Sequence, residues 1–271
     1  MNALTARAGR MARRLTSRWR PLPGVIIIGA QRSGTTSLFD VMRRHDEIEG
    51  AAVKEIHFFD EHFRRGLSWY RSFFRVPHED SVLPMEATPF YLAHPHAPQR
   101  IAQHVPDAKL IALLRDPTSR AISHYRYSVA LGREPLPFLE ALKAEEERID
   151  DEWNRMVQDP RYTSPRFRAY SYKHRGRYAE QIDRFLEHVP ADQILLLNMG
   201  DLVARPHTLL SQISQFLDIA DFPEDIVVSK RNASSTGAVD DPEAVQYLHA
   251  YFEPLNEHLA RDHGISFEET P

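Results

Sequence analysis

Two glycines and an arginine follow a short apolar run near the start of the chain, and together they could bind an anion. The segment GAQRSGTT comes directly after the run at 25–28, and Gly29 and Gly34 have the G-x-x-x-x-G spacing of a phosphate-binding loop. In such a loop, backbone N–H groups and the N-terminus of the next helix face the ligand. Nucleotide triphosphatases place a lysine after the second glycine, but this chain has Thr35, while Arg32 supplies a cation inside the loop. The pattern favours an anion site that does not hydrolyse ATP or GTP; a tight turn without a ligand is the alternative.

A carboxylate and an imidazole in the segment 51–60 could transfer protons. If this segment is extended, alternate side chains share a face, so Glu55 and His57 lie side by side. A glutamate beside a histidine is a plausible acid–base pair. A surface glutamate next to a packed histidine is the alternative interpretation.

An arginine and a serine eight positions apart could form a second anion site. The apolar run KLIALL at 109–114 predicts a buried strand, and Asp116 followed by Pro117 predicts a helix start immediately after it. Arg115 therefore lies at the carboxyl end of a strand, where open α/β sheets bind ligands, and Ser123 lies two turns into the helix. An ion pair of Arg115 with Asp116, and an ordinary helix serine, are the alternatives.

Strands and helices alternate along the chain, which predicts one α/β domain. Strands are expected at 25–28, at the start of 85–91 before a loop at Pro89, at 109–114 and at 193–198, and helices from residue 35, from residue 117, and within 138–142, 171–186, 201–217 and 242–263. A chain of 271 residues with 42% hydrophobic residues can bury one substantial core. We therefore assign residues 23–271 to a single domain.

Composition excludes several classes of function. The net charge is −4 and the sequence pI is about 6.4, so no basic field indicates nucleic-acid binding. The chain has no cysteine, which excludes disulfides, thiolate metal sites and a cysteine nucleophile and fits a cytoplasmic protein. The first twenty residues contain six arginines and no acid, and no apolar run long enough to span a membrane follows. We expect residues 1–22 to be a disordered basic tail, with weak contact to a membrane surface as the alternative.

Several of these segments resemble sulfotransferases that use 3′-phosphoadenosine-5′-phosphosulfate (PAPS). GAQRSGTTSL is similar to the family's 5′-phosphosulfate loop, LLRDPTSRAISHY to its 3′-phosphate motif, and KEIHFFD to the segment that holds the catalytic base in the heparan sulfate 3-O- and N-sulfotransferase branch and its bacterial relatives. The resemblance runs from about residue 25 to 217. It implies a P-loop-like three-layer fold, with a central, mostly parallel sheet flanked by helices.

The resemblance also implies roles for individual residues. The 5′-phosphosulfate would be bound by Gln31, Arg32, Ser33, Gly34, Thr35 and Thr36, the 3′-phosphate by Arg115 and Ser123, and the adenosine end by a basic loop with Lys230 and Arg231. Glu55 would be the general base, surrounded by His57 and Asp60, and Arg32 would balance charge on the leaving phosphate. MEATPFY resembles a segment near the acceptor cleft, which makes Glu86 a second carboxylate of interest. Two departures are Arg32, where the heparan sulfate enzymes usually have lysine, and Asn232, where a glycine is expected.

The predicted reaction is transfer of a sulfuryl group from PAPS to a hydroxyl or amine, leaving adenosine 3′,5′-bisphosphate. The resemblance implies an acceptor that is a glycan, a glycolipid or a related small metabolite, and sulfuryl transfer requires no metal. A small-molecule kinase and a non-catalytic PAPS-binding protein are the alternatives; magnesium-dependent consumption of ATP would favour the former. The sequence makes no prediction of the acceptor's identity or of the oligomeric state.

Overall fold

A parallel sheet forms the centre of the molecule. The computed structural model describes residues 16–76, 81–228 and 241–267 of the chain. Within these ranges the sheet has five strands in the order β2-β3-β1-β4-β5, and every neighbouring pair is parallel. The strands are β1 (Val25–Gly29), β2 (Ile48–Gly50), β3 (Leu83–Ala87), β4 (Lys109–Leu114) and β5 (Ile194–Asn198). The α/β prediction is confirmed, and the strands expected at 25–28 and 109–114 are present.

β1 occupies the middle of the sheet and is buried on both faces. Val25 pairs with Met85 of β3 on one side and with Lys109 of β4 on the other. Along β1, the side chains of Val25 and Ile27 join one hydrophobic cluster, while those of Ile26 and Ile28 join the cluster on the opposite face. A strand covered on both sides needs apolar residues at every position, which explains the unbroken apolar run.

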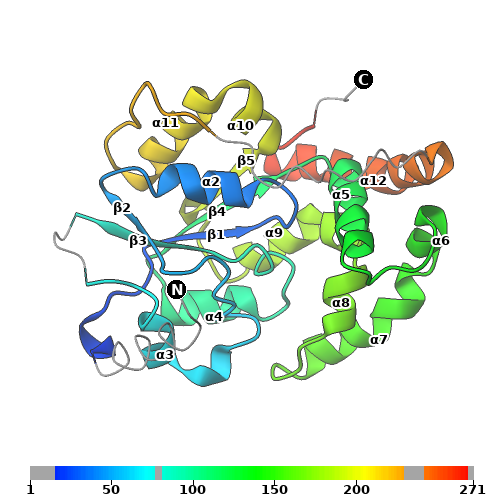
Figure 1. The fold of residues 1–271 in the computed structure, drawn as a ribbon, viewed down its shortest axis with the longest axis horizontal. Helices are drawn as coiled ribbons and strands as arrows, with labels where there is room; N and C mark the ends of the chain where they lie inside the picture. Colours follow the sequence, from blue (N-terminus) through cyan, green and yellow to red (C-terminus); the bar gives the residue numbers. More distant parts are fainter. Residues whose placement is uncertain (1–15, 77–80, 229–240, 268–271) are drawn as a thin grey trace.

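Helices cover both faces of the sheet (Figure 1). The helices are α2 (Thr35–Met42), α3 (Leu67–Arg71), α4 (Ala97–His104), α5 (Pro117–Ala130), α6 (Phe138–Lys143), α7 (Glu145–Gln158), α8 (Pro165–Tyr170), α9 (Tyr178–Leu186), α10 (Met199–Ala204), α11 (Pro206–Leu217) and α12 (Pro242–His263). One face packs against α2, α10 and α11, and the other against α3, α4 and α9. This gives the three layers that the family resemblance implied.

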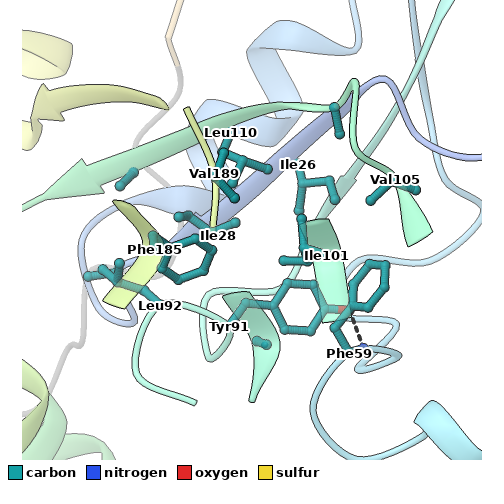
Figure 2. Packing of buried hydrophobic residues seen from close by; sticks show 14 of the residues in the cluster. Ile26, Ile28, Phe59, Tyr91, Leu92, Ile101, Val105, Leu110, Phe185 and Val189 are labelled. Carbon is teal, nitrogen blue, oxygen red and sulfur yellow. Dashed lines mark hydrogen bonds between the residues drawn. The ribbon is translucent and has the colours of Figure 1, made fainter. Parts of the chain in front are cut away.

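The layer formed by α3, α4 and α9 joins the sheet to two loops that border the cleft described below. Figure 2 shows Ile26, Ile28 and Leu110 of the sheet packed among side chains of α4 and α9, with Tyr91 and Phe59 at one side of the same cluster. Phe59 belongs to the segment that follows β2, and Tyr91 to the turn that follows β3. The core therefore reaches from the sheet to both segments.

Two further hydrophobic clusters hold a group of helices beside the sheet. α5, α6, α7, α8 and α12 lie together at one side of the molecule (Figure 1). Phe138 and Leu142 of α6 pack with Leu248 and Phe252 of α12, and Ala121 of α5 joins them. α5 belongs both to this group and to the end of β4, so it links the group to the sheet.

The helix expected at 201–217 is two helices. α10 ends at Ala204 and α11 begins at Pro206, with Arg205 between them in a non-helical conformation. Proline has no N–H to donate within a helix, but it is well tolerated at the first helical position, where no intrahelical bond is needed. The prediction of one continuous helix was wrong for this reason.

Part of the segment assigned to the basic tail packs on the domain. Ser17–Trp19 form a single 3-10 turn, η1, and Arg20 Nη1 donates a hydrogen bond of 2.6 Å to the carbonyl oxygen of Phe74. Residues 1–15 of that tail, and the basic loop with Lys230 and Arg231, lie outside the described residues. No helix in the described ranges combines the length and apolar character needed to cross a membrane.

Candidate active site

The two glycines of the phosphate-type loop are required for different reasons. Gly29 ends β1, and a Cβ atom there would lie 2.6 Å from the Cβ atom of Leu92. Gly34 has φ of 80° and caps the N-terminus of α2, a left-handed conformation that side-chain-bearing residues rarely adopt. The turn is held to the sheet by the Ala30 N–H, which donates 2.8 Å to the carbonyl oxygen of Leu113 in β4. The loop thus presents the first turn of α2, whose amides have no intrahelical acceptors, beside the end of the sheet.

Arg32 links this loop to the second predicted anion site. Its Nε donates a 3.0 Å hydrogen bond to Ser123 Oγ on α5, and its guanidinium lies over the ring of Tyr127 at 4.9 Å. Arg115 Nη1 donates to the carbonyl oxygen of Arg32 at 3.4 Å. The hydroxyl of Tyr178 in turn donates to the carbonyl oxygen of Arg115 at 3.0 Å. Two sites that are far apart in the sequence therefore adjoin in space.

The position of Arg115 and Ser123 follows from the start of α5. Asp116 Oδ1 accepts a 2.7 Å hydrogen bond from the Ser119 N–H, and Pro117 occupies the first helical position, as the sequence predicted. This cap begins the helix directly after β4, so Arg115 lies at the carboxyl end of the strand and Ser123 faces it from the helix.

A single cleft of about 1330 Å³ brings the predicted residues together. Its lining includes, from the predicted site, Gln31, Arg32, Gly34, Thr35, Thr36, Glu55, Arg115 and Ser123. Ser33 and His57 are not part of this lining; Ser33 is wholly buried beneath the loop. The same lining also has an apolar part, made by Met199, Leu202, Val203, Ile226 and Val227. The cleft thus contains both anion sites and a carboxylate.

The segment 51–60 is not extended, which corrects the sequence prediction. Glu55 and His57 have φ of 62° and 56°, and Ile56, Phe58 and Phe59 are all buried, so side chains do not alternate between two faces. The N–H of Glu55 donates 2.8 Å to the carbonyl oxygen of Ala87 at the end of β3. The pairing of Glu55 with His57 is nevertheless present, because the left-handed backbone at both residues turns their side chains together.

Glu55, His57 and Asp60 form a chain of charges. Glu55 Oε1 lies 3.0 Å from Lys54 Nζ, and Glu55 Oε2 lies 3.5 Å from His57 Nε2. On its other side, His57 Nδ1 lies 2.6 Å from Asp60 Oδ2, and the Asp60 side chain is fully buried. With a carboxylate on each ring nitrogen, the imidazole is held in one orientation.

The pKa values in this chain of charges move apart. Burial alone would raise the pKa of Glu55, but the hydrogen bond with His57 and the ammonium of Lys54 lower it to about 2. Burial alone would lower the pKa of His57, but Asp60 and Glu55 raise it to about 9. At neutral pH the pair is therefore a carboxylate beside an imidazolium.

Two arginines of this region were not predicted from the sequence. Arg168 of α8 lines the cleft, pairs with Glu61, and has Nη2 at 3.4 Å from His57 Nε2. Arg175 is only 3% exposed and donates to Gln31 Oε1 in the loop. Burial, with Arg168 and another arginine near by, lowers the pKa of Arg175. The SYKHRGRY segment contained a signal, since arginines flank its glycine, but the sequence did not indicate that one of them reaches the loop.

Glu86 is not in the cleft lining. It is 0% exposed within β3, and its carboxylate accepts hydrogen bonds from the hydroxyls of Tyr70, Thr88 and Tyr91. Burial raises its pKa to about 7, although the three hydroxyls oppose that rise. Glu86 therefore belongs to the core behind Glu55 and His57. Within the described ranges, no group of three or more His, Asp and Glu side chains is placed to hold a metal ion.

Comparison with known proteins gives a consistent family. The sulfotransferase domain family matches residues 22–239. Heparan sulfate glucosamine 3-O-sulfotransferase 3A1 of Mus musculus is 31% identical over 217 residues, which is 79% of this chain and 50% of that protein. Bifunctional heparan sulfate N-deacetylase/N-sulfotransferase 1 of Caenorhabditis briggsae is 31% identical over 211 residues, 75% of this chain and 23% of that protein. The chain thus spans half or less of the length of these curated relatives.

A solved structure agrees with the sequence comparison. The sulfotransferase from Alicyclobacillus acidocaldarius superposes with a TM-score of 0.69 at 27% identity, covering 89% of this chain and 95% of that one. Because the superposition covers most of both chains, the fold as a whole is shared. From the family match, the relatives and this shared fold, we conclude that the chain belongs to the sulfotransferase family.

Proposed function

We propose that this protein transfers a sulfuryl group from PAPS to a hydroxyl or amine of a glycan or glycolipid. The observation that carries the proposal is the single cleft lined by the phosphate-type loop, by Arg115 with Ser123, and by Glu55. PAPS has a phosphosulfate at the 5′ position and a phosphate at the 3′ position, so it needs two anion sites at a fixed separation. A nucleoside triphosphate has no group for the second site.

In this proposal the loop and Arg32 bind the 5′-phosphosulfate. The amides of the loop and of the first turn of α2 donate to its oxygens, and the helix N-terminus favours negative charge there. Arg32 adds a planar guanidinium, which can bind two oxygens at once. Because Arg32 Nε also reaches Ser123 Oγ at 3.0 Å, the same cation lies between the 5′ and 3′ phosphates.

The transfer step breaks one bond and forms one bond. The acceptor oxygen or nitrogen attacks sulfur in line with the bond from sulfur to the 5′-phosphate oxygen. That bond breaks, its electron pair stays on the phosphate of adenosine 3′,5′-bisphosphate, and the acceptor's proton passes to the Glu55 carboxylate. Charge that develops on the leaving phosphate is stabilised by donors already in place, which is mainly positioning and electrostatics.

The ionised state of Glu55 fits a general base that becomes effective only when the acceptor is bound. Its pKa of about 2 keeps it ionised at neutral pH, but such a carboxylate is a weak base. We infer that the bound acceptor replaces part of the contact with Lys54 or His57, which strengthens Glu55 as a base when the proton must move. The side chain of Glu55 is 45% exposed, so an acceptor can reach it from the cleft.

The proposed acceptor is a glycan containing an amino sugar. The names of the relatives describe 3-O- and N-sulfation of heparan sulfate, in which a hydroxyl or an amine is the acceptor group. Arg168 lies in the cleft wall beside His57, where a cation would attract the carboxylates and sulfates of such a chain.

A binding experiment tests the donor site first. Isothermal titration with adenosine 3′,5′-bisphosphate, run beside ATP and without magnesium, should give binding of the bisphosphate and much weaker binding of ATP. Binding of ATP only after magnesium is added, with no binding of the bisphosphate, would overturn the proposal in favour of a kinase.

A transfer experiment then tests the reaction. The protein is incubated with ³⁵S-labelled PAPS and a panel of acceptors: unsulfated heparosan, N-sulfated heparosan, an aminosugar glycolipid and a phenol. Label on either polysaccharide or on the glycolipid is the expected result. Binding of the bisphosphate without label on any acceptor would support a PAPS-binding protein without activity.

A further inference from the structure

The backbone on which Glu55 and His57 stand is left-handed at both residues. Few non-glycine residues adopt such φ values, and they persist only where surrounding contacts fix them. In this segment such contacts are made by the backbone N–H groups of residues 57–59. The N–H of Phe58 donates 2.9 Å to the Tyr91 hydroxyl, that of Phe59 donates 3.3 Å to the same hydroxyl, and that of His57 lies 3.4 Å from Thr88 Oγ1. Figure 2 shows the contact between Phe59 and Tyr91.

Both of these hydroxyls are bound from behind by one carboxylate. Tyr91 donates 3.0 Å to Glu86 Oε1, and Thr88 donates 2.9 Å to Glu86 Oε2. A hydroxyl has one proton to give. In its ionised form, which a pKa of about 7 makes predominant only above neutral pH, Glu86 accepts from both hydroxyls, so each hydroxyl directs its proton to Glu86 and its lone pairs to the backbone amides of residues 57–59. Donation to a carboxylate also polarises the hydroxyl and strengthens the bond that it accepts.

We propose that Glu86 is a positioning residue for the Glu55–His57 pair, which it orients through the hydroxyls of Tyr91 and Thr88. The inference rests on the proposed function in so far as Glu55 is the base there. Glu86 itself does not reach the cleft: it is wholly buried and acts through two intermediate side chains. A carboxylate buried at this depth without a hydrogen-bonding role would be strongly unfavourable, and this network gives it one.

The chain offers a matched pair of variants that separates positioning from general stability. Tyr70 and Tyr91 are both 0% exposed, and both donate to the same oxygen of Glu86. Of the two, only Tyr91 also accepts hydrogen bonds from the backbone amides of the segment 51–60. Tyr70 contacts that segment through its ring, which stacks on Phe58 with the ring centroids 4.3 Å apart. Tyr91→Phe and Tyr70→Phe both keep the ring and remove one hydroxyl that donates to Glu86, but only Tyr91→Phe also leaves the N–H groups of Phe58 and Phe59 without their acceptor, so it should lose more thermal stability.

The first readout is the pKa of His57, measured by NMR titration of its ring. In the wild type this pKa is raised to about 9 by Asp60 and Glu55. Tyr91→Phe should lower this pKa by a unit or more toward its ordinary value, because the segment 51–60 no longer holds the side chains of Glu55, His57 and Asp60 together. Tyr70→Phe should leave it within a few tenths of a unit. Equal pKa values in the two variants, whether lowered or unchanged, would overturn the inference.

The second readout is catalytic. The assay uses the acceptor that becomes labelled in the transfer experiment. Tyr91→Phe should lower kcat at least tenfold and leave KM for PAPS unchanged. Tyr70→Phe should change kcat less than twofold. If no acceptor is found, the proposed function has failed while the NMR titration still decides the positioning role.

A second pair of variants covers the case in which Tyr91→Phe does not fold. Thr88→Val keeps the shape of the side chain and removes its hydroxyl, whereas Thr88→Ser keeps the hydroxyl. Thr88→Val should lower the pKa of His57 and Thr88→Ser should not. An unchanged pKa in Thr88→Val would count against the network.

Discussion

The two sides of the cleft, to which the proposal assigns the phosphates (the phosphate side) and the general base (the base side), are built differently. On the phosphate side, β1 leads through the loop 30–34 into α2, and β4 leads through Arg115 and Asp116 into α5; the proposed donors are backbone amides and arginines near the ends of these regular elements. On the base side, the segment 51–60 is irregular and is held by hydroxyl side chains that come from the turn after β3. The first side is fixed by secondary structure and the second by single side chains.

This difference predicts which properties survive substitution. Backbone amides cannot be removed by changing a side chain, so binding of the donor should decrease in moderate steps. The base side has one carboxylate for the proton and one network to orient it, so turnover should be lost in a single step. Binding and turnover can therefore be separated by variants on opposite sides of the cleft.

The largest effect is expected for Glu55→Gln. The amide cannot accept the proton, and a general base contributes about 10²- to 10⁴-fold to the rate. We expect turnover to fall by about that factor and the Kd for adenosine 3′,5′-bisphosphate to change less than about threefold, as measured by steady-state kinetics and titration calorimetry. Glu187→Gln, at an exposed position after α9, is the matched control and should change neither. Normal turnover in Glu55→Gln would remove this residue from the role.

Arg115→Ala should have the next largest effect, this time on binding. A hydrogen bond to a charged group contributes about 1.5–3 kcal/mol, so the Kd for the bisphosphate should rise about 10- to 100-fold. Arg64→Ala, which removes an exposed arginine of the turn Phe63–Arg65, is the control. An equal loss in both variants would mean that Arg115 acts only through overall charge, and the contrast between the two sides would fail.

The pH dependence of stability should report on the base side. Since the pKa of His57 in the folded protein, about 9, lies above its unfolded value, its stabilising effect is complete below about pH 6.5 and is lost as the pH rises through 9. We expect the free energy of unfolding to exceed that of His57→Asn by about 2 kcal/mol at pH 6.5, and the difference to shrink by pH 10. Urea unfolding across this range measures it. A difference that stays constant with pH would contradict the charged pair.

The smallest effect is expected for Gly34→Ala. Gly34 and Gly132 have φ of 80° and 66°, and a Cβ atom at either meets no atom closer than 3.6 Å. Alanine at each position should therefore cost about 1 kcal/mol of stability, from backbone strain alone. Only Gly34→Ala should also weaken binding of the bisphosphate, by a few-fold, because Gly34 sets the direction of the loop amides. Unchanged binding would show that the loop tolerates the strain.

The regular side of the cleft was predictable because its signals are local. Five buried positions in β1, the Asp116 cap and the two loop glycines each depend on neighbours a few residues away. The base side was not, because the conformation of Glu55 and His57 is fixed by hydroxyls that lie about thirty residues further along the chain. Periodicity predicts the conformation that a segment favours by itself, and here distant contacts impose a different one.

The same argument explains the arginines that were missed. Arg168 and Arg175 come from α8 and the turn after it; Arg168 lines the cleft, and Arg175 reaches Gln31 of the loop from a buried position, because the fold brings this helix group beside the loop. A single sequence contains no signal for that packing. The break before Pro206, in contrast, has a local signal, since proline is favoured at the first position of a helix and disfavoured in its interior.

The close approach of Gly29 and Leu92 has a consequence for how this protein can change over evolutionary time. A Cβ atom at position 29 would lie 2.6 Å from the Cβ atom of Leu92 itself, so a shorter side chain at 92 still leaves the obstructing carbon in place. Only glycine at position 92, or a shift of the backbone, would make room. Replacement of Gly29 thus requires a prior change at a position outside the loop. Change at the end of β1 is therefore restricted by the order in which mutations can be accepted.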